Sequence, residues 1–516
     1  MPKIHVHEKA LAHLSRGLYR SPASALRELV SNGWDANATV VRISTNYPNF
    51  YQLAVEDNGD GFSAEEFARL MGGGIGNSEK RPAAKKMKYG RPIIGRLGIG
   101  MLGIAQICGS FTVTSKMKDG TGFRAKVKLY DLLKEKLDTN DSSVVSSSSD
   151  QQFEEVDVGV YDFEEQYDPN KANFGTAIVT DDVHPAFVRA FQLSLKFEKF
   201  RKPPSQWQKA IDIVSGVRSI QELGDYWRLL WELAASCPVP YVSANCLPQK
   251  LISDEQKLLE SYNFKVFVDS LELKKPIHLK GNPAGYTIRR IQPQHLTPYG
   301  RNLRFHGYII VQEGAQLKPD ELRGLLIRIK NVAIGYYDPG MLDYRYNEGP
   351  RSRWLTGEIY ATEGLEDALN IDRDSFNRFH PQFRAMQEYV HSVLHEKVFP
   401  EVYKQIEVRS SDRALTKRTE RTSHLTQVLS DVSTKPVSVR SVTKSSDYAP
   451  AEVSVKRESK QLQVVIPDEA DILTKKSNRQ LASSILALFE VAMNEPTDTR
   501  RREVFRRSLL SLLSKW

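Results

Sequence analysis

Three polar residues in the stretch RELVSNGWDANAT have a spacing that suits chemistry. Glu28, Asn32 and Asp35 are separated by four and three positions. At about 3.6 residues per turn they share one face of a helix. A carboxylate on that face can orient or deprotonate a water molecule, and an asparagine one turn later can offer Mg²⁺ a neutral oxygen ligand. The same stripe also fits a helix face that simply meets solvent.

Glycine-containing motifs follow the stripe. EDNGDG places Asp57 at the end of a predicted strand, with Gly59 and Gly61 after it. Asp57 can accept a hydrogen bond from an exocyclic amine such as that of adenine, and the glycines permit close approach of the base. GRLGIG, residues 95–100, precedes a predicted helix, where backbone N–H groups and the helix dipole favour phosphate. A last glycine stands before Thr176, at the start of a further predicted strand.

Each motif taken alone has a simpler explanation. The GxxGxG pattern also fits a turn that starts a helix, and DNGDG also fits a tight turn. A polar helix stripe is most often solvated. All four occur in order within the first 176 residues, and this order favours a nucleotide site.

Together the motifs resemble those of the GHKL superfamily of ATPases. This Bergerat-fold group contains gyrase-type topoisomerases, ninety-kilodalton heat-shock chaperones, histidine kinases and MutL. RELVSNGWDANAT is similar to the N-box, and the stretch MGGGIGNSEK is similar to the ATP lid of MutL- and MORC-type members. The resemblance covers about residues 15–180. It implies a Bergerat α/β sandwich ATPase domain over residues 1–185, with ATP and Mg²⁺ as its ligands.

The resemblance also implies a role for single residues. Glu28 resembles the general base and Asn32 the Mg²⁺ ligand. Asp57 resembles the aspartate that binds adenine, assisted through water by Thr176, and Asp35 resembles an N-box residue that lines the pocket near the base. The other predicted ATP contacts, in the second motif, the lid and the glycine loop, are Gly59, Gly61, Asn77, Ser78, Lys80, Gly95, Arg96, Leu97, Gly98, Ile99 and Gly100.

Two features refine this expectation. Trp34 departs from the small or polar residues commoner at its position in relatives; we expect it in the core, the alternative being contact with an N-terminal segment. Histidine kinases of the superfamily generally lack a hydrolytic glutamate comparable to Glu28. No phospho-acceptor helix precedes the motifs, since the stretch around His13 is too short for a dimerisation hairpin. Hydrolysis is therefore favoured over phosphotransfer to protein.

A second, transducer-like α/β domain with a helical portion is predicted over residues 186–400. Hydrolytic GHKL proteins place a basic residue of this domain at the γ-phosphate. RGLLIRIKNVAIGYYDPG resembles a MORC segment and makes Lys330 the candidate. Alternatively, Arg328 and Lys330 both point outward from a half-exposed strand. Further on, a structural charge network is expected of Asp372, Arg373 and Asp374.

Length and composition indicate the number of domains and the cellular compartment. The chain has 516 residues, of which 40% are hydrophobic, which suits two or three globular domains of roughly 100–200 residues each. No apolar run of about 18 residues predicts a membrane helix, and the N-terminus lacks a secretory hydrophobic region. The three cysteines show no metal-ligand spacing. We expect a cytoplasmic protein, or a nuclear one in a eukaryote.

The C-terminal part is expected to be less compact. Residues 138–152 read as a polar surface insertion, residues 401–460 as a partly flexible linker, and residues 461–516 as amphipathic helices. From Glu401 onward, 21 lysines and arginines face 15 acidic residues, so this part carries six of the nine net positive charges. A basic appendage can contact DNA, an acidic protein client or anionic lipid, or remain a solvated tail.

The leading functional hypothesis is an ATP-operated clamp. ATP binding would close the lid and bring two copies together as a homodimer that closes on a client. Slow hydrolysis would then reopen the dimer. One alternative is a nucleotide-sensing scaffold without significant turnover. Another is a DNA-associated remodelling protein of MORC or MutL character.

Overall fold

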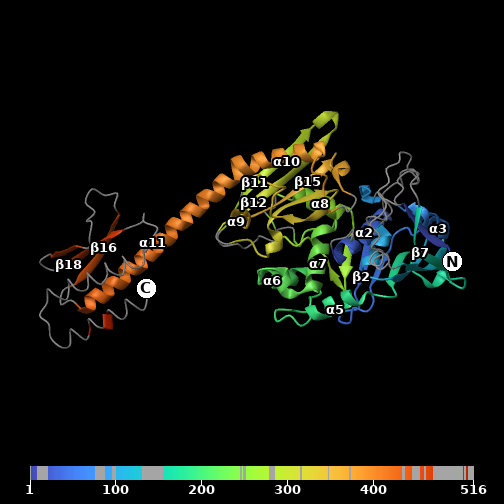
Figure 1. The fold of residues 1–516 in the computed structure, drawn as a ribbon, viewed down its shortest axis with the longest axis horizontal. Coiled ribbons are helices and arrows are strands. Elements are labelled where there is room, and N and C mark those ends of the chain that lie inside the picture. Colours follow the sequence, from blue (N-terminus) through green and yellow to red (C-terminus); the bar gives the residue numbers. More distant parts are fainter. Residues whose placement is uncertain are drawn as a thin grey trace, which may run out of the picture. The chain divides into compact units, whose positions relative to one another are not determined.

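The computed structural model describes most of the chain. The described residues are 2–7, 21–75, 88–95, 100–130, 155–243, 247, 251–277, 285–313, 316–346, 348–370, 374–432, 436–443, 454–457, 461–468, 504 and 507–508. The chain divides into two compact units, Met1–Val402 and Tyr403–Trp516, whose elements are labelled in Figure 1. In the described part, no helix is long and apolar enough to cross a bilayer.

A ten-stranded sheet organises the N-terminal part of the first unit. Its order is β10-β9-β2-β3-β8-β5-β6-β7-β1-β4. Its strands are β1 (Lys3–His7), β2 (Val40–Ser44), β3 (Ala54–Asp57), β4 (Gly72–Ile75), β5 (Ser110–Lys116), β6 (Gly122–Leu129), β7 (Glu155–Phe163), β8 (Gly175–Thr180), β9 (Lys265–Val268) and β10 (Leu271–Glu272). Buried and more exposed residues alternate along β6, as expected for a sheet with one covered face. The mixed α/β fold class predicted from the sequence is confirmed.

The first unit also contains helices, of which α2 and α3 contact this sheet. The α-helices are α2 (Pro22–Asp35), α3 (Ala64–Met71), α5 (Pro185–Ser194), α6 (Trp207–Ser215), α7 (Asp225–Ser236), α8 (Ser253–Ser261), α9 (Gly349–Ser352) and α10 (Pro381–Val393). Short 3₁₀ segments are η2 (Lys88–Gly90), η3 (Gly100–Gln106), η4 (Pro169–Lys171), η5 (Ile220–Leu223), η6 (Pro298–Gly300), η7 (Asp320–Leu322) and η8 (Glu366–Ala368). Two of these helices begin at local capping residues: Ser21 caps α2, and Ser63 with Glu66 forms the capping box of α3.

Helix α2 is the central helix of the first unit. It contacts β2 and β3 of the sheet and packs against α7, beside which it lies in Figure 1. Trp34, near its end, is fully buried and meets the rings of Tyr262 and Phe264 edge-on, with centroids 5.0 Å apart in both pairs. The predicted core position of Trp34 is therefore confirmed.

A five-stranded sheet forms the second-sheet region, residues 285–402. Its order is β11-β12-β15-β13-β14. Its strands are β11 (Tyr286–Leu296), β12 (Leu303–Gln312), β13 (Gly324–Ile329), β14 (Val332–Asp338) and β15 (Leu355–Glu363). The pairing of β13 with β15 is parallel and the other pairings are antiparallel. This region follows α8 and the last two strands of the first sheet in the chain.

An ion pair is buried in the second sheet. Arg328 on β13 donates to both carboxylate oxygens of Glu358 on β15, at 2.9 and 2.8 Å, and both residues are 0% exposed. The hydroxyls of Tyr241, Tyr337 and Tyr360 also donate to this carboxylate. The alternative that Arg328 points outward from a half-exposed strand is therefore wrong. Arg328 points inward because the neighbouring strand β15 supplies the buried carboxylate of Glu358.

Glu358 stays ionised because of these partners. Burial alone would raise its pKa, but the facing Arg328 guanidinium and the donated hydroxyls lower the pKa to about 2. Because the pKa falls on folding, the carboxylate stabilises the fold above its usual value of 4.5, and this contribution is lost as the pH drops toward 2.

Two predictions about the first unit need correction. The boundary expected at residue 185 does not separate two sheets, because β9 and β10, after that residue, join the first sheet, and β9 pairs in parallel with β2. This pairing covers an edge that would otherwise be exposed. The helix expected after the glycine motif is the 3₁₀ segment η3. Glycines at residues 100 and 103 disfavour an α-helix.

The second unit differs from its predicted organisation. Residues 401–432, expected as linker, are helical: α11 (Phe399–Val432) begins in the first unit and continues here after a π turn, Leu394–Val398. Between Pro400 and Pro436 the chain contains neither glycine nor proline, so nothing interrupts a helix.

A small sheet follows α11. It joins β16 (Val437–Thr443), β18 (Leu462–Asp468) and β17 (Ser454–Arg457) in that order. Residues 462–468, predicted as helical, are therefore a strand, whose valine-rich QVVI run suits β structure. The predicted insertion at 138–152 and most of the predicted C-terminal helices lie outside the described residues.

The buried ion pair predicts a large stability effect. Glu358→Gln leaves Arg328 charged and uncompensated in the core, so we expect the free energy of unfolding to fall by about 3–5 kcal/mol. Chemical denaturation followed by circular dichroism measures the change. Glu363→Gln is the matched control, because Glu363 lies on the same strand but pairs with Arg304 at the surface, with side chains 43% and 53% exposed. Its expected cost is below about 1 kcal/mol, and equal costs for the two variants would contradict the assignment.

Candidate ATP site

The predicted polar stripe lies on α2 with unequal burial. Glu28 is 6% exposed, Asn32 is exposed and Asp35 is partly buried. Oε1 of Glu28 accepts from the Arg27 guanidinium at 3.2 Å. A solvated stripe would not bury a carboxylate in this way. The simple alternative of a wetted helix face therefore fails for Glu28.

Asp57 is the last residue of β3, and glycines surround it. Its Oδ1 accepts from the N–H of Gly59 at 2.7 Å. A β-carbon on Gly175 would lie 1.9 Å from the Asp57 carbonyl oxygen, and one on Gly33 would lie 3.2 Å from the Asp57 β-carbon. The Gly175 φ of 112° also favours glycine. Three glycines from separate motifs thus allow α2, the following turn and β8 to close around one aspartate.

Thr176 lies next to Asp57, as the motif order predicts. The two residues are direct partners in the antiparallel pairing of β3 with β8. Directly opposed residues on neighbouring strands present their side chains on the same face of the sheet. The structure therefore brings together the predicted adenine-binding aspartate and its predicted helper.

The end of α2 holds the segment that leads into the glycine motif, residues 88–95. Asp35 accepts from the N–H groups of Ile94 and Gly95, at 2.8 and 2.6 Å. Trp34 donates its indole N–H to the carbonyl of Pro92 at 2.8 Å. Asp35 therefore fixes the start of the glycine motif through both carboxylate oxygens. Its predicted contact near the base remains a prediction.

Asp60, the second aspartate of DNGDG, was not among the predicted site residues. It accepts from Asn37 at 2.6 Å and pairs with Lys88 and Lys118 at 3.3 and 3.4 Å. The backbone N–H of Lys88 in turn donates to Asn37 at 2.9 Å. This carboxylate thus secures the beginning of segment 88–95. The sequence feature that could have indicated this role is the position of Asp60 inside the DNGDG motif.

Lys330 reaches this region from the second sheet. Its ammonium donates to the carbonyl of Ile93 at 3.0 Å and lies 3.6 Å from Glu366. Ile93 directly precedes the two residues that Asp35 holds. The turn between β13 and β14 therefore places a cation against the segment leading into the glycine motif. Contact of Lys330 with a γ-phosphate remains a prediction.

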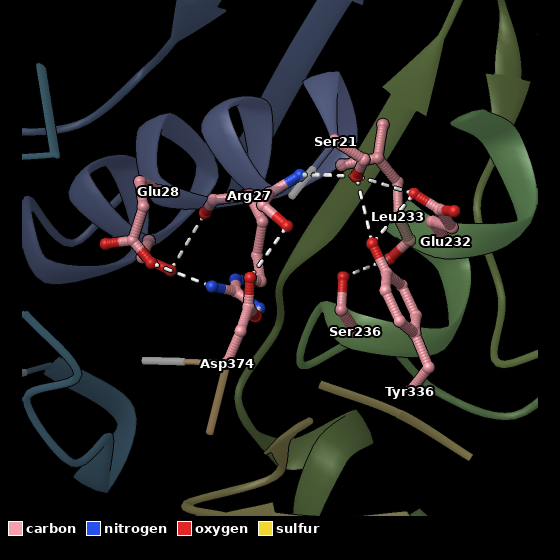
Figure 2. A network of polar contacts seen from close by, with 10 residues as sticks. Ser21, Arg27, Glu28, Glu232, Leu233, Ser236, Tyr336 and Asp374 are labelled. Carbon is pink, nitrogen blue, oxygen red and sulfur yellow. Dashed lines mark hydrogen bonds and ion pairs between the residues drawn. The ribbon is translucent and has the colours of Figure 1, made fainter. Parts of the chain in front are cut away.

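A polar network joins α2 to the second-sheet region (Figure 2). Arg27, 3% exposed, lies between Glu28 and Asp374, with its second nitrogen 2.6 Å from Asp374. At the start of the helix, Ser21 and Tyr336 both donate to Glu232 on α7, at 2.7 and 3.0 Å. Asp374 was expected in a charge network with Asp372 and Arg373, which lie outside the described residues. Its described partner instead comes from the first motif.

Part of the predicted site cannot be placed. Gly61 is described and has a φ of 68°, and a β-carbon there would lie 2.5 Å from the Lys116 carbonyl oxygen, so this position needs glycine. Gly95 and Gly100 are also described. The remaining lid and glycine-loop residues lie outside the described residues: Asn77, Ser78, Lys80, Arg96, Leu97, Gly98 and Ile99.

Comparisons with known proteins support the family resemblance. Residues 19–159 match the sequence model of the histidine kinase-, DNA gyrase B- and HSP90-like ATPases. A putative type II restriction enzyme, HgiDII of Herpetosiphon aurantiacus, is 38% identical over 110 residues, which are 21% of this chain and 17% of that protein. This chain therefore spans less than a fifth of that relative.

Among solved structures, the crystal structure of the N-terminal domain of a DNA repair protein covers 75% of this chain and 97% of its own. The TM-score is 0.38 at 12% sequence identity, and so distant a likeness does not bear on function. The family match over the first motifs agrees with the geometry of α2, β3 and the glycine turns. Residues 19–159 thus form a domain of the histidine kinase-, DNA gyrase B- and HSP90-like ATPase family.

Proposed function

We propose that this protein binds ATP with Mg²⁺ and hydrolyses it slowly, using the cycle to close and reopen a dimeric clamp. One observation carries the proposal. Within the matched family domain, α2 presents Glu28 and Asn32 while its Gly33 packs on Asp57 at the end of β3. The predicted base, metal ligand and adenine acceptor therefore belong to two elements in direct contact.

The residues around Asp57 suit an adenine ring. Glycine at residues 33, 59 and 175 leaves the aspartate without neighbouring β-carbons on three sides, and its carboxylate can accept from the exocyclic amine. Thr176 stands beside it on β8. The carboxylate would select adenine because a buried acceptor left without a donor is costly.

Asn32 suits Mg²⁺ as a single protein ligand. Its side chain is exposed one turn after Glu28, and Mg²⁺ commonly takes one or two protein oxygens with phosphate and water completing its shell. Within the described residues no cluster of three or more His, Cys, Asp or Glu side chains could hold a metal, and such a cluster is not needed here. When bound, the ion would neutralise charge on the phosphates.

Glu28 would act as the general base. It would accept a proton from a water molecule as the water oxygen bonds to the γ-phosphorus and the bond to ADP breaks. Arg27 holds one oxygen of this carboxylate, which limits the orientations that the base can adopt. Lys330 is our candidate for stabilising negative charge during transfer, since it already reaches the segment that leads into the glycine motif.

Two other functions compete with the clamp. A nucleotide-sensing scaffold would bind ATP at the same residues without turnover, and product formation over hours at high protein concentration separates the two. A DNA-associated role is favoured by the net positive charge after residue 400 and by the similarity to a relative named as a putative type II restriction enzyme. It rests on the charge and on a similarity limited to 110 residues.

The clamp predicts a change of size with nucleotide. Adding a non-hydrolysable ATP analogue and Mg²⁺ should convert monomer to dimer, measured by light scattering after size exclusion. An unchanged molar mass at saturating analogue would contradict the clamp.

Repeating the measurement with duplex DNA at increasing salt tests the DNA-associated function, because phosphate contacts weaken steeply as counterions compete. Absence of DNA binding even at low salt would contradict the DNA-associated function.

Removing the base should separate binding from hydrolysis. Glu28→Gln should lower kcat by roughly 10²–10⁴-fold, the usual contribution of a positioned general base, while affinity for the ATP analogue is retained. Phosphate release measures the rate, and calorimetric titration measures the affinity. Glu56→Gln, an exposed carboxylate on β3, is the matched control and should turn over like the wild type. A Glu28→Gln protein with unimpaired kcat would refute the assignment of the base.

Removing the charge of Asp57 should affect binding first. Asp57→Asn retains the size and an acceptor for Gly59 but loses a carboxylate oxygen, so affinity for ATP should fall at least roughly tenfold. Titration with a fluorescent ATP analogue measures the loss. Asp162→Asn, exposed on β7, is the control. Unchanged affinity in the folded Asp57 variant would place the adenine site elsewhere.

A further inference from the structure

We propose that Asp374 is a positioning residue for ATP hydrolysis: by holding Arg27, it sets the side chain of Glu28 from the second-sheet region. This inference rests on the proposed role of Glu28 as the base. It adds that the base is correctly placed only when a segment 347 positions away is docked on α2. The ATPase domain would then be complete only with the second sheet in place.

The geometry forms a short chain of charges. One guanidinium nitrogen of Arg27 lies 2.6 Å from Asp374, and the other lies 3.2 Å from Glu28. Figure 2 shows the guanidinium between the two carboxylates, with Asp374 approaching α2 from outside the helix. The planar fork of arginine fixes both partners at once. A shift of Asp374 would therefore move the group that holds the base.

Asp374 is itself held firmly. Its Oδ2 accepts from the Ser24 hydroxyl at 2.9 Å, and its side chain is only 2% exposed. A β-carbon on Gly335 of β14 would lie 2.8 Å from the Asp374 carbonyl oxygen, so this glycine lets the segment pack closely on the second sheet. The position of Asp374 is thus set by β14 on one side and by α2 on the other.

Burial makes this contact energetically important. Burial alone would lower the pKa of Arg27, but Asp374 first and Glu28 second raise it above its usual value. Without Asp374, Glu28 would have to balance more of a buried positive charge. We expect Arg27 then to draw the Glu28 carboxylate into a tighter pair, away from the orientation that suits an attacking water. Such a displacement lowers the rate of the chemical step more than it lowers binding.

The test compares full-length variants by steady-state ATP hydrolysis and by titration with a non-hydrolysable analogue. Asp374→Asn should lower kcat by roughly 10–100-fold, the cost of a displaced catalytic group, with analogue affinity within about twofold of wild type. In a Glu28→Gln background the same substitution should change the residual rate by less than about twofold, because both act on one step. Arg27→Lys supplies a second variant if Asp374→Asn fails to fold, since one ammonium cannot replace the fork.

The control removes a neighbouring link between the same parts. Tyr336→Phe, also on β14, deletes the hydroxyl that donates to Glu232 and lies near Ser21 but leaves Arg27 and its partners intact. It should lower thermal stability without changing kcat. If Tyr336→Phe and Asp374→Asn lower kcat equally, the contact merely tethers the second sheet and the inference is wrong.

The remaining outcomes separate this inference from the proposed function. Wild-type kcat in Asp374→Asn, with Glu28→Gln impaired, overturns the positioning role and leaves the ATPase assignment intact. An equal drop in rate in both the wild-type and Glu28→Gln backgrounds indicates general damage and also overturns it. If Glu28→Gln turns over like the wild type, the proposed base fails, and the positioning role fails with it.

Discussion

Helix α2 is buried along almost its whole length, so its charges must be neutralised inside the protein. Arg27 and Glu28 are both among its buried residues, and an isolated buried charge would cost several kcal/mol. Glu28 compensates Arg27 in part, and Asp374 supplies the rest from the second-sheet region. The helix that carries the first motif therefore depends on a residue far along the chain for its stable burial.

The far end of the same helix has a different task. Trp34, Asp35 and Asn37 each bond to the backbone of segment 88–95. These contacts fix the segment that leads into the glycine motif, while Lys330 contacts the same segment from the second sheet. The two parts of the first unit thus meet at both ends of α2. Contacts from the second-sheet region thus reach both the Arg27–Glu28 pair and the segment that leads into the glycine motif.

Local signals in the sequence were reliable where the partner was also local. The cap at Ser21 and the capping box of Ser63 with Glu66 involve residues three positions apart, and both follow the usual N-cap residue pattern. The pattern was less informative for residues 401–432, where a polar composition suggested a linker and the structure has a helix. Composition reports the absence of a large apolar face. That absence does not exclude a helix, because residues 401–435 contain no glycine or proline to interrupt one.

The sequence by itself determined the motifs, their order and the side of α2 on which Glu28 and Asn32 lie, because helical spacing is a property of the backbone. It also determined that Asp57 ends a strand beside glycines. Only the tertiary structure decided which polar groups meet across the chain: the charged side chains of Arg27 and Asp374, 347 positions apart, and the Lys330 ammonium with the backbone carbonyl of Ile93, 237 positions apart. No local pattern encodes such pairs, because they arise when separate elements pack and buried charges must find partners.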